Sequence, residues 1–181
     1  IAGVQAAGFR VTVAAPQAGP LSHALAEAGI EHVCFPTNES EVNRPSQAER
    51  RADLACLLRR VRPDLLHANS LAMSRLSGPV AAEAGIPSIG HLRDIVRLSQ
   101  QAIGDLNRHR RLLAVSHAVR AYHIDAGLAG AKAHVVYNGI DLTRFRPRQP
   151  TGYLHRELVL PPDAYLIGTI GQICLRKGQD V

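Results

Sequence analysis

Short apolar segments of strand length recur along the chain, and the stretches between them are long enough to form helices. The segments are rich in β-branched and other apolar residues, and they cover residues 11–15, 32–35, 65–68, 88–91, 112–115, 135–137 and 166–170. Strands that alternate with helical stretches are typical of βαβ units, in which the strands run parallel. The pattern therefore predicts an α/β fold built on a parallel sheet.

Local chemistry marks the ends of several of these helices. Pro20 suits the first position of a helix, and Gly29 suits its end. Ser46 and Glu49 have the spacing of a capping box, which predicts that a second helix starts there. Pro63 stops this helix before the next strand. The helix carries an apolar stripe, which consists of Leu54, Leu57, Leu58 and Val61.

The composition fits an ordinary globular protein. Apolar residues make up 46% and charged residues 20% of the 181 positions, which excludes a disordered tail and a fibrous repeat. No apolar run reaches the roughly 18 residues of a membrane-spanning helix. Because Cys34, Cys56 and Cys174 lie far apart without Cys-x-x-Cys spacing, we expect core cysteines in a reducing compartment, and a cytoplasmic protein.

The net charge of +6, from 21 basic and 15 acidic residues, favours anionic partners. Only 4% of the residues are aromatic, so stacking platforms for bases are scarce and we expect no nucleic-acid partner. The helix after Ser46 offers a different anionic partner, because a basic amphipathic helix can lie on the inner face of a membrane. A core-packing helix with solvated arginines is the favoured alternative; the arginines are Arg50, Arg51, Arg59 and Arg60.

A charged stretch with proline and glycine, residues 146–152, is the expected domain boundary. It predicts one α/β domain over residues 1–149. Residues 150–181 then hold a linker and the first βα unit of a second α/β domain.

Polar residues follow most of the predicted strands. In open parallel sheets ligands bind beyond the carboxyl ends of the strands, so these residues are the candidates for a site. They are His67, Asn69 and Ser70, then His91, Arg93 and Asp94, then Ser116 and His117, then Asn138, Gly139 and Asp141, and finally Gly171, Gln172, Arg176 and Lys177.

The candidates differ in how well a structural role explains them. His91 is favoured as a functional residue, whereas Arg93 and Asp94 are as well explained by a local salt bridge. A lone strand histidine such as His67 is more often a satisfied core residue, and Ser116 is first of all a good helix N-cap. No histidine has metal-ligand spacing, so we predict no metal and no cofactor.

Two further segments have common structural explanations. Asn-Gly at 138 and 139 is the commonest tight-turn dipeptide. Lys177 followed by glycine could bind phosphate at a helix N-terminus, but the Gly-x-x-x-x-Gly-Lys spacing of a P-loop is absent.

Taken together, three segments resemble one family. Residues 113–116, residues 135–141 with Phe145 and Pro147, and residues 167–171 with Lys177 to Asp180 are similar in order and spacing to the group 1 (family 4) retaining glycosyltransferases. The resemblance covers essentially the whole chain.

This resemblance implies a GT-B architecture, in which two Rossmann-like domains with helices on both sheet faces enclose a cleft. It implies a cytoplasmic hexosyltransferase of bacterial type in carbohydrate biosynthesis. The amino-terminal domain would receive a sugar, polysaccharide or lipid-linked acceptor, and the carboxy-terminal domain would bind a nucleotide-sugar donor.

The same resemblance assigns roles to residues. His91 would reach the donor sugar as a catalytic residue, and Arg93, Asp94, Ser116, Asn138, Gly139 and Asp141 would lie on the acceptor side or at the domain junction. Lys177 would neutralise the donor's diphosphate, beside Gly171, Gln172 and Arg176. A fixed cation there would stabilise the charge that builds up on the leaving group without a metal.

The chain also departs from the family. Gln172 stands where the family commonly has arginine, so a diphosphate cation is missing unless Arg176 replaces it. The family's first strand would precede Ile1, and its Glu-bearing nucleotide-sugar motif would follow Val181. We therefore expect these residues to be part of a longer polypeptide and to be inactive alone.

Two alternatives remain open at this point. One is a nucleotide-sugar epimerase of the same architecture, although Asn138 to Asp141 together with Lys177 fits the transferases better. The other is a degenerate, non-catalytic binding module, which Gln172 favours.

Overall fold

The computed structural model describes residues 1–36 and 45–171. The chain forms two units, Ile1–Asn138 and Gly139–Val181, which are described separately. The boundary expected between residues 149 and 150 stays a prediction.

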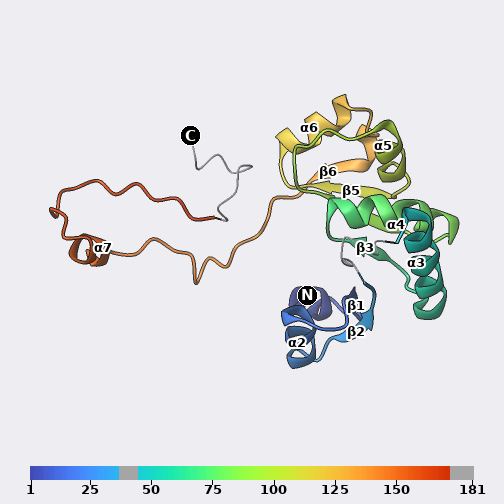
Figure 1. The fold of residues 1–181 in the computed structure, drawn as a ribbon, viewed down its shortest axis with the longest axis horizontal. Coiled ribbons are helices and arrows are strands. Elements are labelled where there is room, and N and C mark those ends of the chain that lie inside the picture. Colours follow the sequence, from blue (N-terminus) through green and yellow to red (C-terminus); the bar gives the residue numbers. More distant parts are fainter. Residues whose placement is uncertain (37–44, 172–181) are drawn as a thin grey trace. The chain divides into compact units, whose positions relative to one another are not determined.

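The first unit contains two parallel sheets (Figure 1). Strands β1 (Thr12–Ala15) and β2 (Glu31–Cys34) form a pair. The larger sheet has the order β3-β4-β5-β6; its strands are β3 (Leu66–Ala68), β4 (Ser88–Leu92), β5 (Arg111–Ala114) and β6 (Ala133–Val135). The α/β class with parallel sheets flanked by helices is therefore confirmed.

Helices connect the strands along the chain. They are α1 (Ala2–Ala6), α2 (Pro20–Glu27), α3 (Gln47–Val61), α4 (Leu71–Glu83), α5 (Gln100–Leu106), α6 (His117–Asp125) and the 3₁₀ turn η2 (Gly130–Lys132). The hydroxyls of Ser46, Ser70, Ser99 and Ser116 cap four of these helices by accepting a backbone N–H three residues later. The full capping box of Ser46 and Glu49 is present, as predicted.

One face of the larger sheet is buried and the other is more open. Ala68, Gly90, Leu112 and Ala133 are paired in register, and all four are buried. The next row along the strands has the opposite orientation, because successive side chains in a strand alternate between faces. In that row His91 and Leu113 are half-buried and His134 is exposed.

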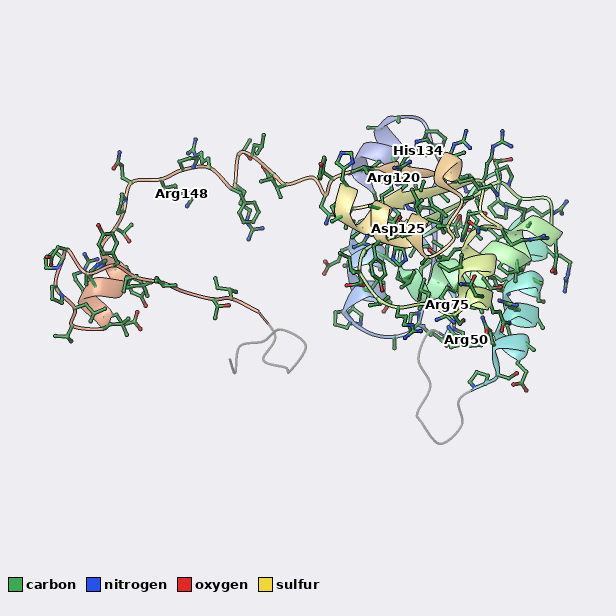
Figure 2. All side chains as sticks on the ribbon, turned by 90° about the horizontal axis from the view of Figure 1, so that it is seen from above. Arg50, Arg75, Arg120, Asp125, His134 and Arg148 are labelled. Carbon is green, nitrogen blue, oxygen red and sulfur yellow. The ribbon has the colours of Figure 1, made fainter. Side chains whose placement is uncertain are left out.

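Two apolar clusters form the core of the first unit. Residues of β4, β5, β6, α5 and α6 build one, around Leu92, Leu106 and Leu112. In the other, the predicted stripe of α3 packs against Phe35 and α4. The guanidinium of Arg120 (labelled in Figure 2) ties α6 to the sheet, because it donates to the carbonyl oxygens of Ala133 at 2.8 Å and Gly130 at 3.2 Å.

The basic face of α3 differs from the one predicted from the sequence. Arg51 is not a solvated arginine, since its Nη2 lies 2.7 Å from a carboxylate oxygen of Asp105 in α5. Arg59 and Arg60, near the end of α3, are exposed. The basic surface of this helix is therefore smaller than the sequence suggested. Among the described residues, no helix has the length and apolar character needed to span a membrane.

The second unit has little regular structure in its described part, with one short helix, α7 (Tyr153–Glu157). The strand predicted over residues 166–170 is wrong, since these residues form no strand. Ile167 and Ile170 are fully exposed. An apolar segment becomes a strand only when a neighbour satisfies its backbone, and no described segment pairs with this one.

Candidate functional site

The carboxyl edge of the larger sheet gathers polar residues from several strands. The strands end in register, because Leu92 of β4 pairs with Ala114 of β5, and Ala114 pairs with Val135 of β6. The residues that follow these ends therefore share one edge. They include the predicted site residues Arg93, Asp94, Ser116 and Asn138.

His91 and His67 lie together on the more open face of the sheet, close to this edge. His67 pairs in register with Ile89, and His91 is two residues beyond Ile89, so the two imidazoles point to the same side. Their ring centroids are 4.8 Å apart. The sequence interpretation of His67 as a satisfied core residue is wrong, because His67 is exposed.

Asn69 and Arg93, which lie two positions after His67 and His91, are also in contact. Arg93 Nη2 donates to the amide oxygen of Asn69 at 2.5 Å. Arg93 forms no salt bridge with any carboxylate in the described part of the chain. The local salt bridge that was the alternative explanation of Arg93 is therefore not present.

Ser74 of α4 holds the backbone of His91 in place. The pairing of β3 with β4 stops at Gly90. At the next residue, the backbone N–H of His91 donates to the hydroxyl of Ser74 at 3.0 Å, and that hydroxyl donates to the carbonyl oxygen of Ser70 at 2.8 Å. A side chain thus replaces the missing strand partner and fixes the end of β4.

Both imidazoles are neutral at pH 7. Although His67 is exposed, the residues packed around its ring displace part of its water and lower its pKa below the usual 6.5, and the charge of Arg93 lowers it further. Burial is also the main reason that the pKa of His91 is lowered, followed by the repulsion of His67 and of Arg93. A neutral imidazole donates one hydrogen bond and accepts another. The Nδ1 atom of His91 is buried without a partner among the described residues.

The segment after β4 is tied to α6. His123 is fully buried, and its Nε2 donates to the backbone carbonyl oxygen of Asp94 at 3.0 Å. The side chain of Asp94 is exposed. Beside this segment lies a hollow of about 580 Å³, lined by Arg97, Leu98, Ser99, Gln100, Tyr122 and Ala126.

Ser116 and Asp141 have structural hydrogen bonds. The hydroxyl of Ser116 accepts the backbone N–H of Val119 at 3.1 Å, which is the N-cap predicted from the sequence. In the second unit, Asp141 Oδ1 accepts from the hydroxyl and backbone N–H of Thr143 and from the backbone N–H of Arg144, and these bonds lower the pKa of Asp141.

The structure does not form the turn expected at Asn138 and Gly139. Both residues are exposed in irregular structure. The turn lies after them, where the backbone N–H of Phe145 donates to the carbonyl oxygen of Asp141 at 2.8 Å. The side chain of Asp141 stabilises that turn, which explains why the turn forms after Asn138 and Gly139 and not at them.

The predicted donor-side residues are mostly beyond the described part of the chain. Gly171 is described and exposed. Gln172, Arg176 and Lys177 lie outside the described residues, so their roles stay predictions. In the described ranges, no group of three or more His, Cys, Asp or Glu side chains is close enough to hold a metal ion; the prediction of no metal and no cofactor stays a prediction.

Sequence reasoning missed the pairing of Asn69 with Arg93 and the support from Ser74 and His123. One signal was available, because His-x-Asn at 67–69 and His-x-Arg at 91–93 repeat one pattern at two strand ends. Ser74 and His123 carry no such signal, since their roles depend on how α4 and α6 pack.

A parallel sheet flanked by helices, with polar residues at its carboxyl edge, is the architecture of the Rossmann-like folds, and in that class of protein ligands bind at this edge. The profile of Glycosyltransferase Family 4 matches residues 1–144, and the chain belongs to that family. The resemblance noted in the sequence is thereby confirmed. No curated protein matches this sequence.

Solved glycosyltransferase structures share the fold. The Anabaena HepE structure in complex with UDP-glucose is 23% identical with a TM-score of 0.70, over 93% of this chain and 47% of that one. A Rickettsia africae glycosyltransferase is 16% identical with a TM-score of 0.64, over 88% of this chain and 44% of that one. Acinetobacter baumannii MurG is 12% identical with a TM-score of 0.56, over 77% of this chain and 40% of that one. This chain therefore spans less than half the length of these structures.

Proposed function

We propose that this chain is the acceptor-side domain and the beginning of the donor-binding domain of a glycosyltransferase. The enzyme would move a sugar from a nucleotide-sugar donor to an acceptor with retention at the anomeric carbon. Membership of Glycosyltransferase Family 4 supports the reaction class. The observation that carries the proposal is the common carboxyl edge of β4, β5 and β6, which gathers His91, Arg93 and Asp94 with Ser116. The acceptor would be a sugar, a polysaccharide or a lipid-linked sugar.

His91 would act on the donor sugar as a neutral imidazole. Its lowered pKa keeps it uncharged at pH 7, so it can donate an N–H to a sugar hydroxyl and orient the ring without adding charge. Ser74 and the end of β4 would hold it in that orientation. Negative charge grows on the departing diphosphate, and Lys177 would stabilise it as a fixed cation, with Arg176 in support.

The nucleotide-sugar donor is also part of the proposal. The HepE structure contains UDP-glucose, and a related fold makes a nucleotide-sugar the first ligand to test here. We place the reaction in the cytoplasm, with peripheral binding at the inner face of the membrane as a further element of the proposal.

The test uses the protein expressed from its full reading frame and a panel of nucleotide sugars. We expect one donor to raise the melting temperature, and Lys177→Ala to weaken that effect. With that donor, His91→Gln should lower kcat about 100-fold while the melting temperature of the free protein stays unchanged, because positioning effects are of this size. His134→Gln, an exposed histidine on the same sheet face, is the matched control and should keep wild-type kcat.

The products separate the open alternatives. Transfer with the donor's anomeric configuration, read by NMR, supports the proposal. Conversion of the donor sugar without an acceptor indicates an epimerase, and donor binding without turnover indicates a binding module. Equal kcat for His91→Gln and wild type would remove His91 from the mechanism.

A further inference from the structure

Four side chains form a polar cluster at the ends of β3 and β4, and we name His67, Asn69, His91 and Arg93 the strand-end cluster. The two histidines contact each other at 4.8 Å between ring centroids, and Arg93 donates to Asn69. One hydrogen bond and one ring contact thus join two strand ends that are 24 residues apart in sequence. The cluster is wider than the single histidine that the proposed reaction uses.

The described residues satisfy only a small part of the hydrogen-bonding capacity of this cluster. Neither imidazole makes a side-chain hydrogen bond to a described residue, and the one hydrogen bond that the Arg93 guanidinium makes to a described residue goes to Asn69. A guanidinium has five N–H donors, and each neutral imidazole adds one. Several N–H donors of the cluster therefore have no acceptor among the described residues.

The charge of the cluster is also uncompensated. Asn69 is neutral, and no described carboxylate forms a salt bridge with Arg93. By contrast, Arg10 and Arg51 each pair with a carboxylate. If Arg93 served only to tie two loops together, a neutral donor would do the same without repelling two adjacent imidazoles.

We propose that the strand-end cluster binds a phosphate group carried by the acceptor substrate. The inference rests on the proposed function for the identity of that substrate, but phosphate binding itself does not require transfer. The guanidinium would donate two N–H bonds to phosphate oxygens and His67 would donate one, which leaves the single N–H of neutral His91 for the donor sugar. Arginine suits this role because its planar fork matches the geometry of phosphate oxygens.

Asn69 is the positioning residue of this site. Its amide oxygen accepts from Arg93 Nη2 and so restrains the guanidinium beside the two rings. Asn69→Ala should weaken phosphate binding less than loss of Arg93. Asn69→Asp should weaken phosphate binding as strongly as loss of Arg93 does, because a carboxylate would neutralise Arg93 and repel the phosphate.

The first experiment measures the imidazole signals of His67 and His91 by NMR in the full protein labelled at histidine, while inorganic phosphate or glucose 1-phosphate is added. We expect both signals to shift, and both pKa values to rise, because a bound anion offsets the charge of Arg93 and the mutual repulsion of the rings. Arg93→Gln should weaken binding at least tenfold. Arg111→Gln is the matched control, since Arg111 is an exposed arginine on β5 and the change in charge is equal.

A second arm identifies where the phosphate comes from. Vesicles of phosphatidic acid in phosphatidylcholine are compared with glucose 1-phosphate for binding to wild type and to Arg93→Gln. Binding of glucose 1-phosphate alone through Arg93 indicates a soluble acceptor, and binding of the vesicles alone through Arg93 indicates a lipid phosphate; either supports the site. Equal losses in Arg93→Gln and Arg111→Gln, or unmoved His67 and His91 signals with every probe, would overturn it. A negative donor screen would leave this result unaffected.

Discussion

His109 is a fully buried imidazole with both ring nitrogens hydrogen-bonded. Its Nε2 lies 2.8 Å from the carbonyl oxygen of Ser74, and its Nδ1 lies 2.8 Å from the hydroxyl of Ser88. A carbonyl oxygen only accepts, so Nε2 carries the proton and Nδ1 accepts from Ser88. The ring therefore links the helix α4 to the strand β4 in its neutral form.

This arrangement predicts how stability depends on pH. Burial lowers the pKa of His109 below its usual 6.5, so the unfolded chain binds more protons than the folded chain at mildly acidic pH. The free energy of unfolding should be nearly constant above about pH 6.5 and fall as the pH decreases below it. Urea unfolding at pH 5, 6 and 7 measures this slope.

Substitution of His109 distinguishes its contribution to the pH dependence of stability from the contributions of the other histidines. His109→Gln should lower the free energy of unfolding at pH 7 by about 2 kcal/mol, because a buried hydrogen-bond partner is lost. It should also reduce the slope between pH 5 and 7, and by more than the substitution His134→Gln at an exposed position. His67 and His91 contribute to the slope that remains, since their pKa values are also lowered. An undiminished slope in His109→Gln would contradict this explanation.

At the scale of elements, α4 contains a proline in its interior and still forms a regular helix. Pro79 has no N–H, so the carbonyl oxygen of Arg75 lacks its usual helical partner. The guanidinium of Arg51 donates to this carbonyl oxygen at 3.4 Å and also pairs with Asp105. One arginine of α3 thus links α4 and α5 at the point where proline weakens the helix.

The close approach of α4 and α5 predicts a large effect of one methyl group. A Cβ atom at Gly78 would collide with the backbone oxygen of Asp105, whereas a Cβ atom at Gly104 would meet nothing. Gly78→Ala should therefore lower the free energy of unfolding by about 3 kcal/mol. Gly104→Ala, the control within α5, should raise it by about 0.5 kcal/mol through higher helix propensity. Denaturant unfolding measures the free energy of unfolding of both variants. Equal effects of the two substitutions would exclude the steric explanation.

Elements with local signals could be predicted, and elements without them could not. The capping box of Ser46 and Glu49 and the N-cap of Ser116 depend on residues three positions apart, so the sequence alone reveals them. The helix α4 continues through Pro79, and the donor from α3 that replaces the missing N–H of proline has no local signal in the sequence. Residues 166–170 have the composition of a strand, but they have no partner among the described residues.

For the molecule as a whole, the strands differ in how many neighbours they have. Within the described residues, β4 and β5 are paired on both sides, whereas β1 and β3 are paired on one side. Backbone amides at a free edge open to solvent more readily than amides inside a sheet.

Amide hydrogen exchange of the full protein tests this difference. We expect the slowest exchange in β4 and β5, and exchange at least tenfold faster in β1 and β2, whose sheet contains only two strands. Mass spectrometry of peptides from each strand measures both rates in one sample. Equal protection of β1 and β5 would show that another segment pairs with the free edge of β1.

The sequence by itself determined the α/β class, the helix caps of Ser46 and Ser116 and the polar strand ends, because periodicity and capping act over a few residues. It also carried the resemblance to Glycosyltransferase Family 4, which the family match confirms. The tertiary structure decided which strand ends became neighbours. Only the pairing of β3 with β4 brings His67 to His91 and Asn69 to Arg93, since contacts between residues 24 positions apart depend on sheet order rather than on local sequence.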